Sequence, residues 1–436
     1  MAAAGGVVDD AGVAADVAET LVLLPTLSLV AESELVVGEH RGSAVDDAVA
    51  RVRRLLAAAR GAEPTASAVR RGLVAMLDDL AGSPAQMLTW TPAIDLADEL
   101  LTLWLSAARA RPASVAYLLM ARTELSGWTG DLRGGLAAAD RAIEVSEEVG
   151  SHALTGWTHV FAARLCAAAG NEQDCLAHRD AGIALGDRLG EPGPRVWGMH
   201  AQGHLLLSTG RVAEAVEALT PVAAIASAIE FAGVRAIPWQ PDWIEALARA
   251  GQDEQAAAAL QSWVATLPAE PDEWHRGIVA RTRVLVDGES AVDELLSALE
   301  DGALAATPIE EARAQLVAGS ALRRRRRPAA SQDMLKRATA TFARVGALGW
   351  LAAAESELTG QRGQADRDPT GGLTVQEMRV AQEIAAGATN RQAATRLFCS
   401  PKTIEYHLTR VYAKLGVRSR AALAGRMATL VPPAEA

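Results

Sequence analysis

Apolar residues near the carboxyl end of the chain follow the 3.6-residue period of an α-helix. They recur at spacings of four, three and four residues and form one stripe, which consists of Ile404, Leu408, Val411 and Leu415. At about 100° per residue, a second set of side chains lies on the opposite face, namely Lys402, Tyr406, Thr409 and Ala413. The pattern predicts a helix with one buried face and one face of cationic, hydroxyl and aromatic groups.

Capping signals predict three more short helices around this one. Thr374 and Glu377 have the spacing of a capping box, and Ser400-Pro401 combines a good N-cap with a residue suited to the first helical position. The four helices are expected to run from Thr374 to Gly387, from Asn390 to Leu397, from Pro401 to Gly416 and from Ser419 to Met427.

A longer period appears in the middle of the chain. Five glycines, each followed by a polar residue, are spaced 40, 40, 41 and 37 residues apart, and they are Gly130, Gly170, Gly210, Gly251 and Gly288. Repetition at this interval predicts stacked helix pairs, with a glycine turn at the end of each first helix. Small residues such as Gly135 and Ala139 follow the turns, where they would let paired helices approach closely.

These patterns divide the chain into four parts. Residues 1–112 are expected to form an N-terminal helical region with a mobile tip and helices at 45–59, 67–80 and 92–110, and residues 113–358 form the repeat array. Residues 359–372 are polar and glycine-rich and read as a flexible linker before the four-helix module at 373–430. Half of the residues are hydrophobic but only 4% are aromatic, which favours close-packed helices over sheets. The expected fold class is therefore all-α.

The module resembles the DNA-binding domain of LuxR-type transcriptional regulators. The run SPKTIEYHLTRVYAKLGVRSR is especially similar, and some dozen positions agree with the family pattern at fixed spacing over about an eighth of the chain. Val375 departs from the pattern, because proline is common there in the family. The resemblance implies that the third helix enters the major groove with its outer face on the bases, and that the fourth helix pairs two subunits on a two-fold site.

The repeats are similar to tetratricopeptide-type repeats, with GDLRGGLAAADRAIEV and GRVAEAVEAL as the best matches. Their period exceeds the usual 34 residues of that family. Residues 310–358 also resemble the segment that precedes the DNA-binding domain in large ATPase-bearing LuxR-type regulators. The expected architecture is therefore a tetratricopeptide-like solenoid followed by a LuxR-type helix-turn-helix domain.

Each candidate DNA-binding residue has a role that follows from its chemistry. The residues expected to face bases are Lys402, Glu405, Tyr406, Thr409 and Arg410. Those expected to hold phosphates are Asn390, Arg391, Thr403 and Lys414, with His407 assigned to a phosphate contact or to packing. The residues expected to pair two copies are Arg420, Ala421 and Ala424.

The distribution of charge along the chain agrees with a DNA-binding carboxyl end. Residues 372–430 carry nine Lys/Arg and three Asp/Glu, a net charge of +6, so the chain total of −11 leaves −17 for the remainder. Only the carboxyl end is therefore expected to be attracted to a polyphosphate.

No pattern in the sequence supports catalysis. There is no Gly-Lys dipeptide, so a phosphate-binding loop is absent, and no His-Glu-x-x-His or Gly-x-Ser-x-Gly pattern occurs. The three cysteines lack metal-ligand spacing, and they fit the reduced cytoplasm. We therefore expect a non-enzymatic protein with no cofactor and no metal.

The expected partners are double-stranded DNA, bound by a homodimer on a two-fold operator, and an unknown ligand or protein bound by the repeats. RNA polymerase is a further candidate partner, whereas a membrane is not, because no apolar segment has the length of a span. The ten tryptophans are expected to serve packing rather than to line a concave ligand site. The alternative function is a helical-repeat scaffold without specific DNA binding.

Overall fold

The structure of the chain is a computed structural model, and it describes residues 94–107, 112–228, 237–359, 373, 375–397, 401–417 and 419–430. Most of the N-terminal region expected at 1–112, including the helices expected at 45–59 and 67–80, lies outside the described residues. So does the linker expected at 359–372, apart from Thr359.

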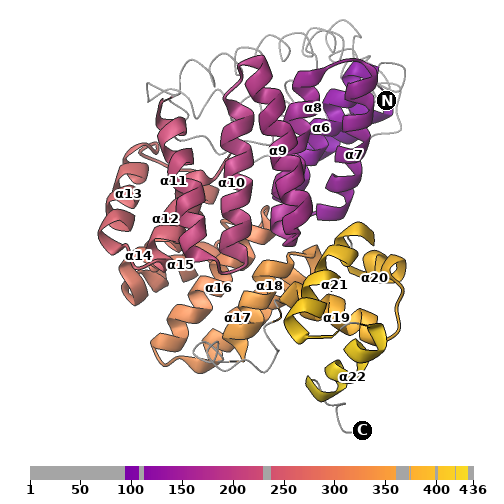
Figure 1. The fold of residues 1–436 in the computed structure, drawn as a ribbon. Helices are drawn as coiled ribbons and strands as arrows, with labels where there is room; N and C mark the ends of the chain where they lie inside the picture. The colour runs from indigo at the N-terminus through magenta and orange to yellow at the C-terminus, as the bar shows by residue number, and fades with distance from the viewer. Residues whose placement is uncertain are drawn as a thin grey trace, which may run out of the picture.

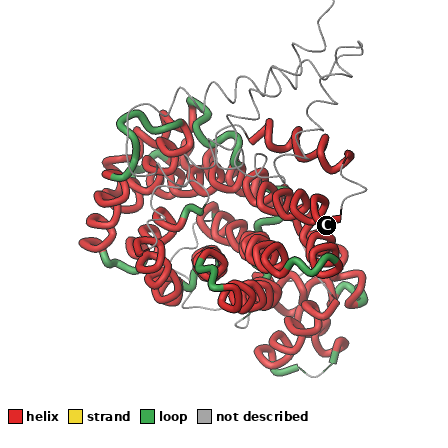
Figure 2. The backbone as a smooth tube through the Cα atoms, turned by 90° about the horizontal axis from the view of Figure 1, so that it is seen from above, coloured by secondary structure: helices red, strands yellow, loops and turns green. Residues whose placement is uncertain are grey.

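Every element within the described ranges is helical, which confirms the all-α prediction (Figures 1 and 2). The first helices are α5 (Ile94–Ala107), α6 (Pro112–Thr129), α7 (Leu132–Glu148), α8 (His152–Ala169), α9 (Glu172–Leu189), α10 (Gly193–Ser208), α11 (Val212–Ala228) and α12 (Trp239–Arg249). They are followed by α13 (Asp253–Ala265), α14 (Glu273–Asp287), the 3-10 turn η2 (Gly288–Ala291), α15 (Val292–Glu300), α16 (Pro308–Arg324), α17 (Pro328–Val345) and α18 (Leu348–Leu358). None of the helices in this part of the chain is long and apolar enough to cross a membrane.

The turns between the helices follow the predicted glycine spacing. All five spaced glycines have positive φ, between 72° and 77°, a conformation that only glycine adopts without strain. On the far side of two of these turns, Asp131 and Asn171 cap α7 and α9 by accepting hydrogen bonds from Gly134 and Asp174 amides. Helices such as α8 and α9 are 18 residues long, which explains why the repeat exceeds 34 residues.

Helices of one pair approach closely where the sequence supplies small residues. A Cβ atom added at Gly135 would lie 2.4 Å from the Cβ atom of Ser126 on α6, and one added at Gly182 would lie 2.6 Å from Val160. Consecutive helices pack in order, and α16 and α18 also pack against α6, α8 and α10 from the start of the array. The array therefore curls back on itself, so that the early helices α6, α8 and α10 meet the late helices α16 and α18.

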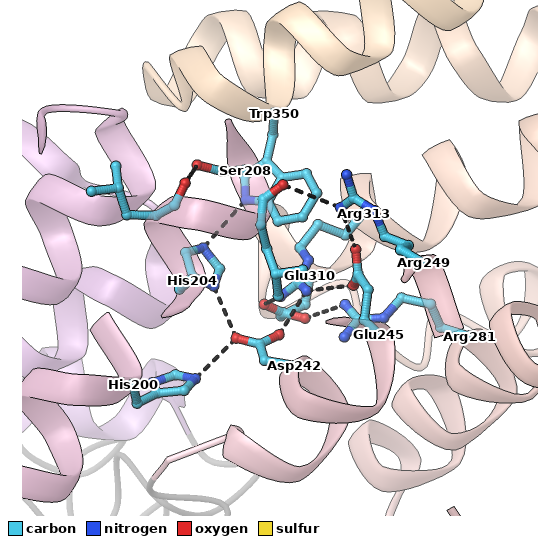
Figure 3. Close-up of polar contacts among 12 residues, drawn as sticks. His200, His204, Ser208, Asp242, Glu245, Arg249, Arg281, Glu310, Arg313 and Trp350 are labelled. Carbon is cyan, nitrogen blue, oxygen red and sulfur yellow. Dashed lines mark hydrogen bonds and ion pairs between the residues drawn. The ribbon is translucent and has the colours of Figure 1, made fainter. Parts of the chain in front are cut away.

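The interior of this curl holds a buried network of charged and polar side chains centred on Arg313 of α16 (Figure 3). Arg313 Nη2 donates to Asp242 Oδ1 at 2.6 Å and to Glu245 Oε2 at 2.7 Å, and its Nη1 donates to Glu310 at 3.0 Å. Arg281 of α14 shares Glu310 with Arg313. We call this set, with the histidines and tryptophan described next, the Arg313 network.

Two histidines and a tryptophan extend the network toward the amino-terminal half of the array. Trp350 Nε1 donates to His204 Nε2 at 3.2 Å, so the proton of the neutral His204 ring lies on Nδ1, which is 3.0 Å from Asp242 Oδ2. His200 Nε2 lies 2.9 Å from the same oxygen. The Arg313 guanidinium also stands 4.5 Å from the centre of the Trp350 ring. The network thus joins α10, α12, α14, α16 and α18.

Burial and charge pairing shift the pKa values of the carboxyl groups in this network in opposite directions, and charge pairing has the larger effect. Burial alone would raise the pKa of Glu310, but Arg313 and Arg281 lower it to about 2. Asp242 has a pKa well below its usual value for the same reason, because burial is outweighed by Arg313 and by hydrogen bonds from the two histidines. Burial lowers the pKa of His200, so that this ring stays neutral. The three carboxylates are therefore ionised in the folded chain, and their stabilisation persists as pH falls until it approaches the lowered pKa values.

The tryptophans serve packing, as predicted. Trp104, Trp128, Trp197, Trp239, Trp263, Trp274 and Trp350 are buried, and Trp157 and Trp243 are partly buried. Trp90 lies outside the described residues.

Replacement of Arg313 by Met is expected to destabilise the array by about 3–5 kcal/mol at pH 7, because three buried carboxylates lose their common partner. Tryptophan fluorescence during urea unfolding measures this loss, since residues 373–430 contain no tryptophan. The exposed Arg327 provides the control, and Arg327→Met should change stability by no more than about 0.5 kcal/mol.

The difference between Arg313→Met and the parent chain should also shrink between pH 7 and pH 4. Without Arg313, protonation of the three carboxylates stabilises the folded chain, because it removes their buried, unpaired charge. In the parent chain the pKa values of these carboxylates are lowered, so acid destabilises the folded chain only below the pH range in which carboxyl groups ordinarily titrate. A deficit that stayed constant over this range would contradict the assignment.

Candidate nucleic-acid interface

The carboxyl-terminal module consists of α19 (Val375–Ala385), α20 (Asn390–Leu397), α21 (Pro401–Leu415) and α22 (Arg420–Leu430). Its bounds agree closely with the four helices expected from the capping signals. The capping box expected at Thr374 cannot be compared, because Thr374 lies outside the described residues. At the other end, Ser419 Oγ accepts a hydrogen bond from the Ala422 amide at 3.1 Å and caps α22 as predicted.

The apolar stripe of α21 faces inward. Ile404 and Val411 are fully buried, Leu408 is 6% exposed, and Leu415 packs at the edge of the same cluster. Among the described residues, the buried cluster draws only on those between Leu373 and Met427, and it includes Val380, Ala393 and Leu423 from the other three helices. The module therefore has a hydrophobic core of its own.

The opposite face of α21 is exposed. Its polar side chains stand in solvent, and they are Lys402, Glu405, Tyr406, Thr409 and Arg410. Tyr406 is 38% exposed, which is high for so large a ring, and its hydroxyl accepts a hydrogen bond from Arg410 Nη1 at 3.0 Å. The helix thus presents cations, hydroxyls and one carboxylate on a single outward surface.

Glu377 of α19 holds the carboxyl-terminal half of α21 in place. Its carboxylate lies 2.5 Å from Lys414 Nζ and 3.4 Å from Arg410 Nε, and the side chain is almost completely buried. Two of the residues expected to contact DNA are therefore oriented by one acid. The sequence pattern around Glu377 had indicated only a capping box for this residue.

Thr403 and His407 lie along one edge of α21 and are buried. Thr403 is fully buried, and its Oγ1 lies 3.3 Å from Asp174 Oδ2 of α9, in the repeat array. His407 is 6% exposed, and neither of its ring nitrogens has a hydrogen-bond partner in the structure. Burial lowers the pKa of His407, so its ring is neutral here. Neither side chain is open to solvent in this arrangement.

The start of α20 is braced by contacts that sequence analysis missed. Thr389 and Gln392 cap one another, since Gln392 Oε1 accepts from the Thr389 amide at 2.9 Å and Thr389 Oγ1 accepts from the Gln392 amide at 3.2 Å. The spacing Thr-x-x-Gln was the available signal. Arg420 Nη1 donates to Asn390 Oδ1 at 2.9 Å, and Arg420 also reaches the Ala388 carbonyl. Arg391 is exposed.

Small residues occupy the outer face of α22. Ala421 is exposed and Ala424 is partly exposed, while Leu423 and Met427 face the core. Arg420, which was grouped with these alanines as a dimerisation residue, is engaged within its own module. The assignment of these three residues to the pairing of two copies stays a prediction.

A compact bundle whose third helix presents a polar outer face defines a helix-turn-helix DNA-binding module. Residues 372–427 match the family model described as bacterial regulatory proteins of the luxR family. The module is a LuxR-type domain, as the sequence resemblance indicated.

Relatives of the chain are similar to it over this module. A Mycobacterium bovis protein that is named as an HTH-type transcriptional regulator is 45% identical to this chain over 67 residues. These residues are 14% of this chain and 8% of that protein. The DNA-binding transcriptional activator DevR/DosR of Mycobacterium tuberculosis is 42% identical over 60 residues, which are 14% of this chain and 28% of that protein. The nitrate/nitrite response regulator NarP of Escherichia coli is 41% identical over 58 residues, or 13% and 27% of the two chains.

Among solved structures, a Rap protein complexed with competence and sporulation factor aligns with 81% of this chain and all of its own. The identity is 14% and the TM-score is 0.45, so this likeness bears on neither function nor mechanism.

Gly416 ends α21 with φ +67°, so Gly416→Ala is expected to destabilise the module by about 1 kcal/mol through backbone strain. Gly425 provides a matched control, because it lies within α22 and a Cβ atom there would meet nothing within 4 Å. Gly425→Ala should stabilise by about 0.5–1 kcal/mol. Thermal melting of a fragment spanning residues 360–436, followed by circular dichroism, measures both; equal effects of the two substitutions would be inconsistent with this account.

Proposed function

We propose that the chain is a sequence-specific transcriptional regulator that binds DNA through α21. The observation that carries this proposal is the outward polar face of α21 on a LuxR-type module, opposite a stripe that is buried. The net charge of +6 on residues 372–430 supports attraction to DNA, and the acidic remainder disfavours non-specific contacts.

Base recognition is assigned to the exposed side chains of α21. Arg410 and Lys402 would donate to guanine, and Glu405 would accept from a cytosine amino group. Tyr406 and Thr409 stand between these charges and would contact base edges or thymine methyl groups. Lys414, Arg391 and Asn390 are assigned to phosphates, together with Thr403 and His407 once their edge of α21 is uncovered.

The repeat array is assigned the sensing role. It would bind a small ligand or a protein and thereby change how two modules are presented to a two-fold operator. The acts of regulation would take place in the cytoplasm, and RNA polymerase is the further partner that such a regulator would contact.

Thr409→Ala and Lys414→Ala should weaken DNA binding in different ways. Loss of a base contact should reduce discrimination between the selected operator and a mismatched one by about 1–3 kcal/mol. Loss of a phosphate contact should weaken both sequences alike and lower the slope of log K against log salt by about 1. Fluorescence anisotropy at two or more salt concentrations, with an operator selected from random DNA, distinguishes the two effects.

Lys336 supplies the control for this experiment, because it is an exposed lysine of α17 outside the module. Lys336→Ala should leave both the slope and the discrimination unchanged. Melting temperatures are needed for Lys414→Ala, since this lysine also pairs with Glu377. Equal, sequence-independent losses in Thr409→Ala and Lys414→Ala would contradict the assigned roles.

Pairing of two modules through α22 should fail in Ala421→Glu, because two carboxylates would face one another across the two-fold axis. A full operator should then titrate as two independent half-sites, with an affinity about 10²-fold lower or more. Gln382→Glu makes the same change of one negative charge on the exposed surface of α19 and should preserve cooperative binding. Analytical ultracentrifugation on full and half operators measures the stoichiometry; cooperative binding that survives in Ala421→Glu would exclude α22 as the interface.

A further inference from the structure

The amino-terminal end of α9 contacts α21 across the boundary between the array and the module. Asp174 lies 3.3 Å from Thr403 Oγ1, and Glu172 Oε2 lies 3.8 Å from Arg410 Nη1. Both acids belong to the first turn of α9. The module lies beside the array in Figure 1, with α19 packed on α18 and α21 near the end of α9. The contact therefore joins an acidic helix end to the helix assigned to DNA.

The array covers the edge of α21 rather than its outer face. Lys402, Tyr406 and Thr409 are exposed, whereas Thr403 and His407, the two residues on the covered edge, are buried. Both ring nitrogens of His407 lack a hydrogen-bond partner, although the side chain is more than nine-tenths buried. A buried polar group without a partner is costly, so this edge has hydrogen-bonding capacity that another molecule could satisfy.

The chemistry of the covered edge matches phosphate. A hydroxyl and an imidazole lie along it, and the carboxylates of α9 lie against this edge, where the phosphates of a DNA backbone would lie if α21 entered the major groove. The rest of α9 stands behind these carboxylates. A duplex and the array therefore compete for one side of the helix.

The contact between the array and the module is loosely packed, which would allow the two to separate. A cavity of about 640 Å³ separates α7, α9 and α17 of the array from α20 of the module, and it is lined on the module side by Ala394, Thr395 and Leu397. The contacts between α9 and α21 are polar and partly exposed, and such contacts contribute little to stability. Since no described residue of the array belongs to the hydrophobic core of the module, the module can separate from the array without losing that core.

We propose that the acidic end of α9 is an internal docking surface for α21, and that the chain must release this contact before α21 can bind DNA. The proposal rests on the DNA-binding function proposed above. The apparent affinity for DNA equals the affinity of the free module multiplied by the fraction of chains in which the module is free. If the module is free in about one chain in ten, complete release raises the affinity for DNA about tenfold.

Asp174→Lys in the full chain tests the proposal, because it replaces the carboxylate that contacts Thr403 with a cation. The matched control is Asp180→Lys, which makes the same charge change on an exposed position of α9 farther along the helix. Comparison of the two variants separates loss of docking from the general attraction of DNA for a less acidic chain.

Two readouts are required. Operator affinity of Asp174→Lys is expected to exceed that of Asp180→Lys about tenfold. Independently of DNA, hydrogen exchange of peptides covering residues 401–410 should be faster in Asp174→Lys than in Asp180→Lys. Should Asp174→Lys fail to fold, Asp174→Asn removes the charge with nearly the same shape and should show both effects in smaller degree.

Equal affinities and equal exchange rates in the two lysine variants would overturn the proposal. Faster exchange in Asp174→Lys, combined with no DNA binding by any variant or by a 360–436 fragment, would support the docking surface and contradict the proposed function. Unchanged exchange together with specific DNA binding would contradict the docking surface and support the proposed function.

Discussion

The array depends on the pairing of Arg313 with three carboxylates in its interior. A solenoid that curls back on itself brings the inner surfaces of its helices together, and here those surfaces carry Asp242, Glu245 and Glu310. One guanidinium bonds to all three, and Arg281, His200 and His204 complete the arrangement. Any departure from this geometry would leave a charge buried without a partner, so the curvature of the array is constrained by electrostatics as well as by packing.

In the module, apolar side chains fill the core and most charged side chains lie on the surface. Its core is an apolar cluster, and of the charged side chains that the structure describes there, Glu377 is the buried one. That buried acid orients Lys414 and Arg410 on α21 before any ligand arrives. Preorganisation of this kind reduces the conformational entropy that binding must overcome. The two parts of the chain therefore use buried charge differently: one to join five helices, the other to aim two cations.

Helices, their ends and the outward face of α21 were predictable from the sequence, because capping residues, glycine turns and apolar spacing are local signals. The Arg313 network was not predictable, since His204 and Trp350 are 146 residues apart and Asp242 and Arg313 are 71 apart. Charged residues are expected on the surface unless their partners are known. For the same reason the burial of Thr403 by Asp174, 229 residues away, had no signal in the local pattern of α21.

The contact between early and late helices of the array affects how the array unfolds. In an open row of repeats, each end can fray alone because it has only one neighbour. Here α18 packs on α8 and α10, so loosening at one terminus removes contacts from the other. The array should accordingly melt as one cooperative unit, and a disturbance among its early helices is transmitted directly to α18, the last described helix of the array.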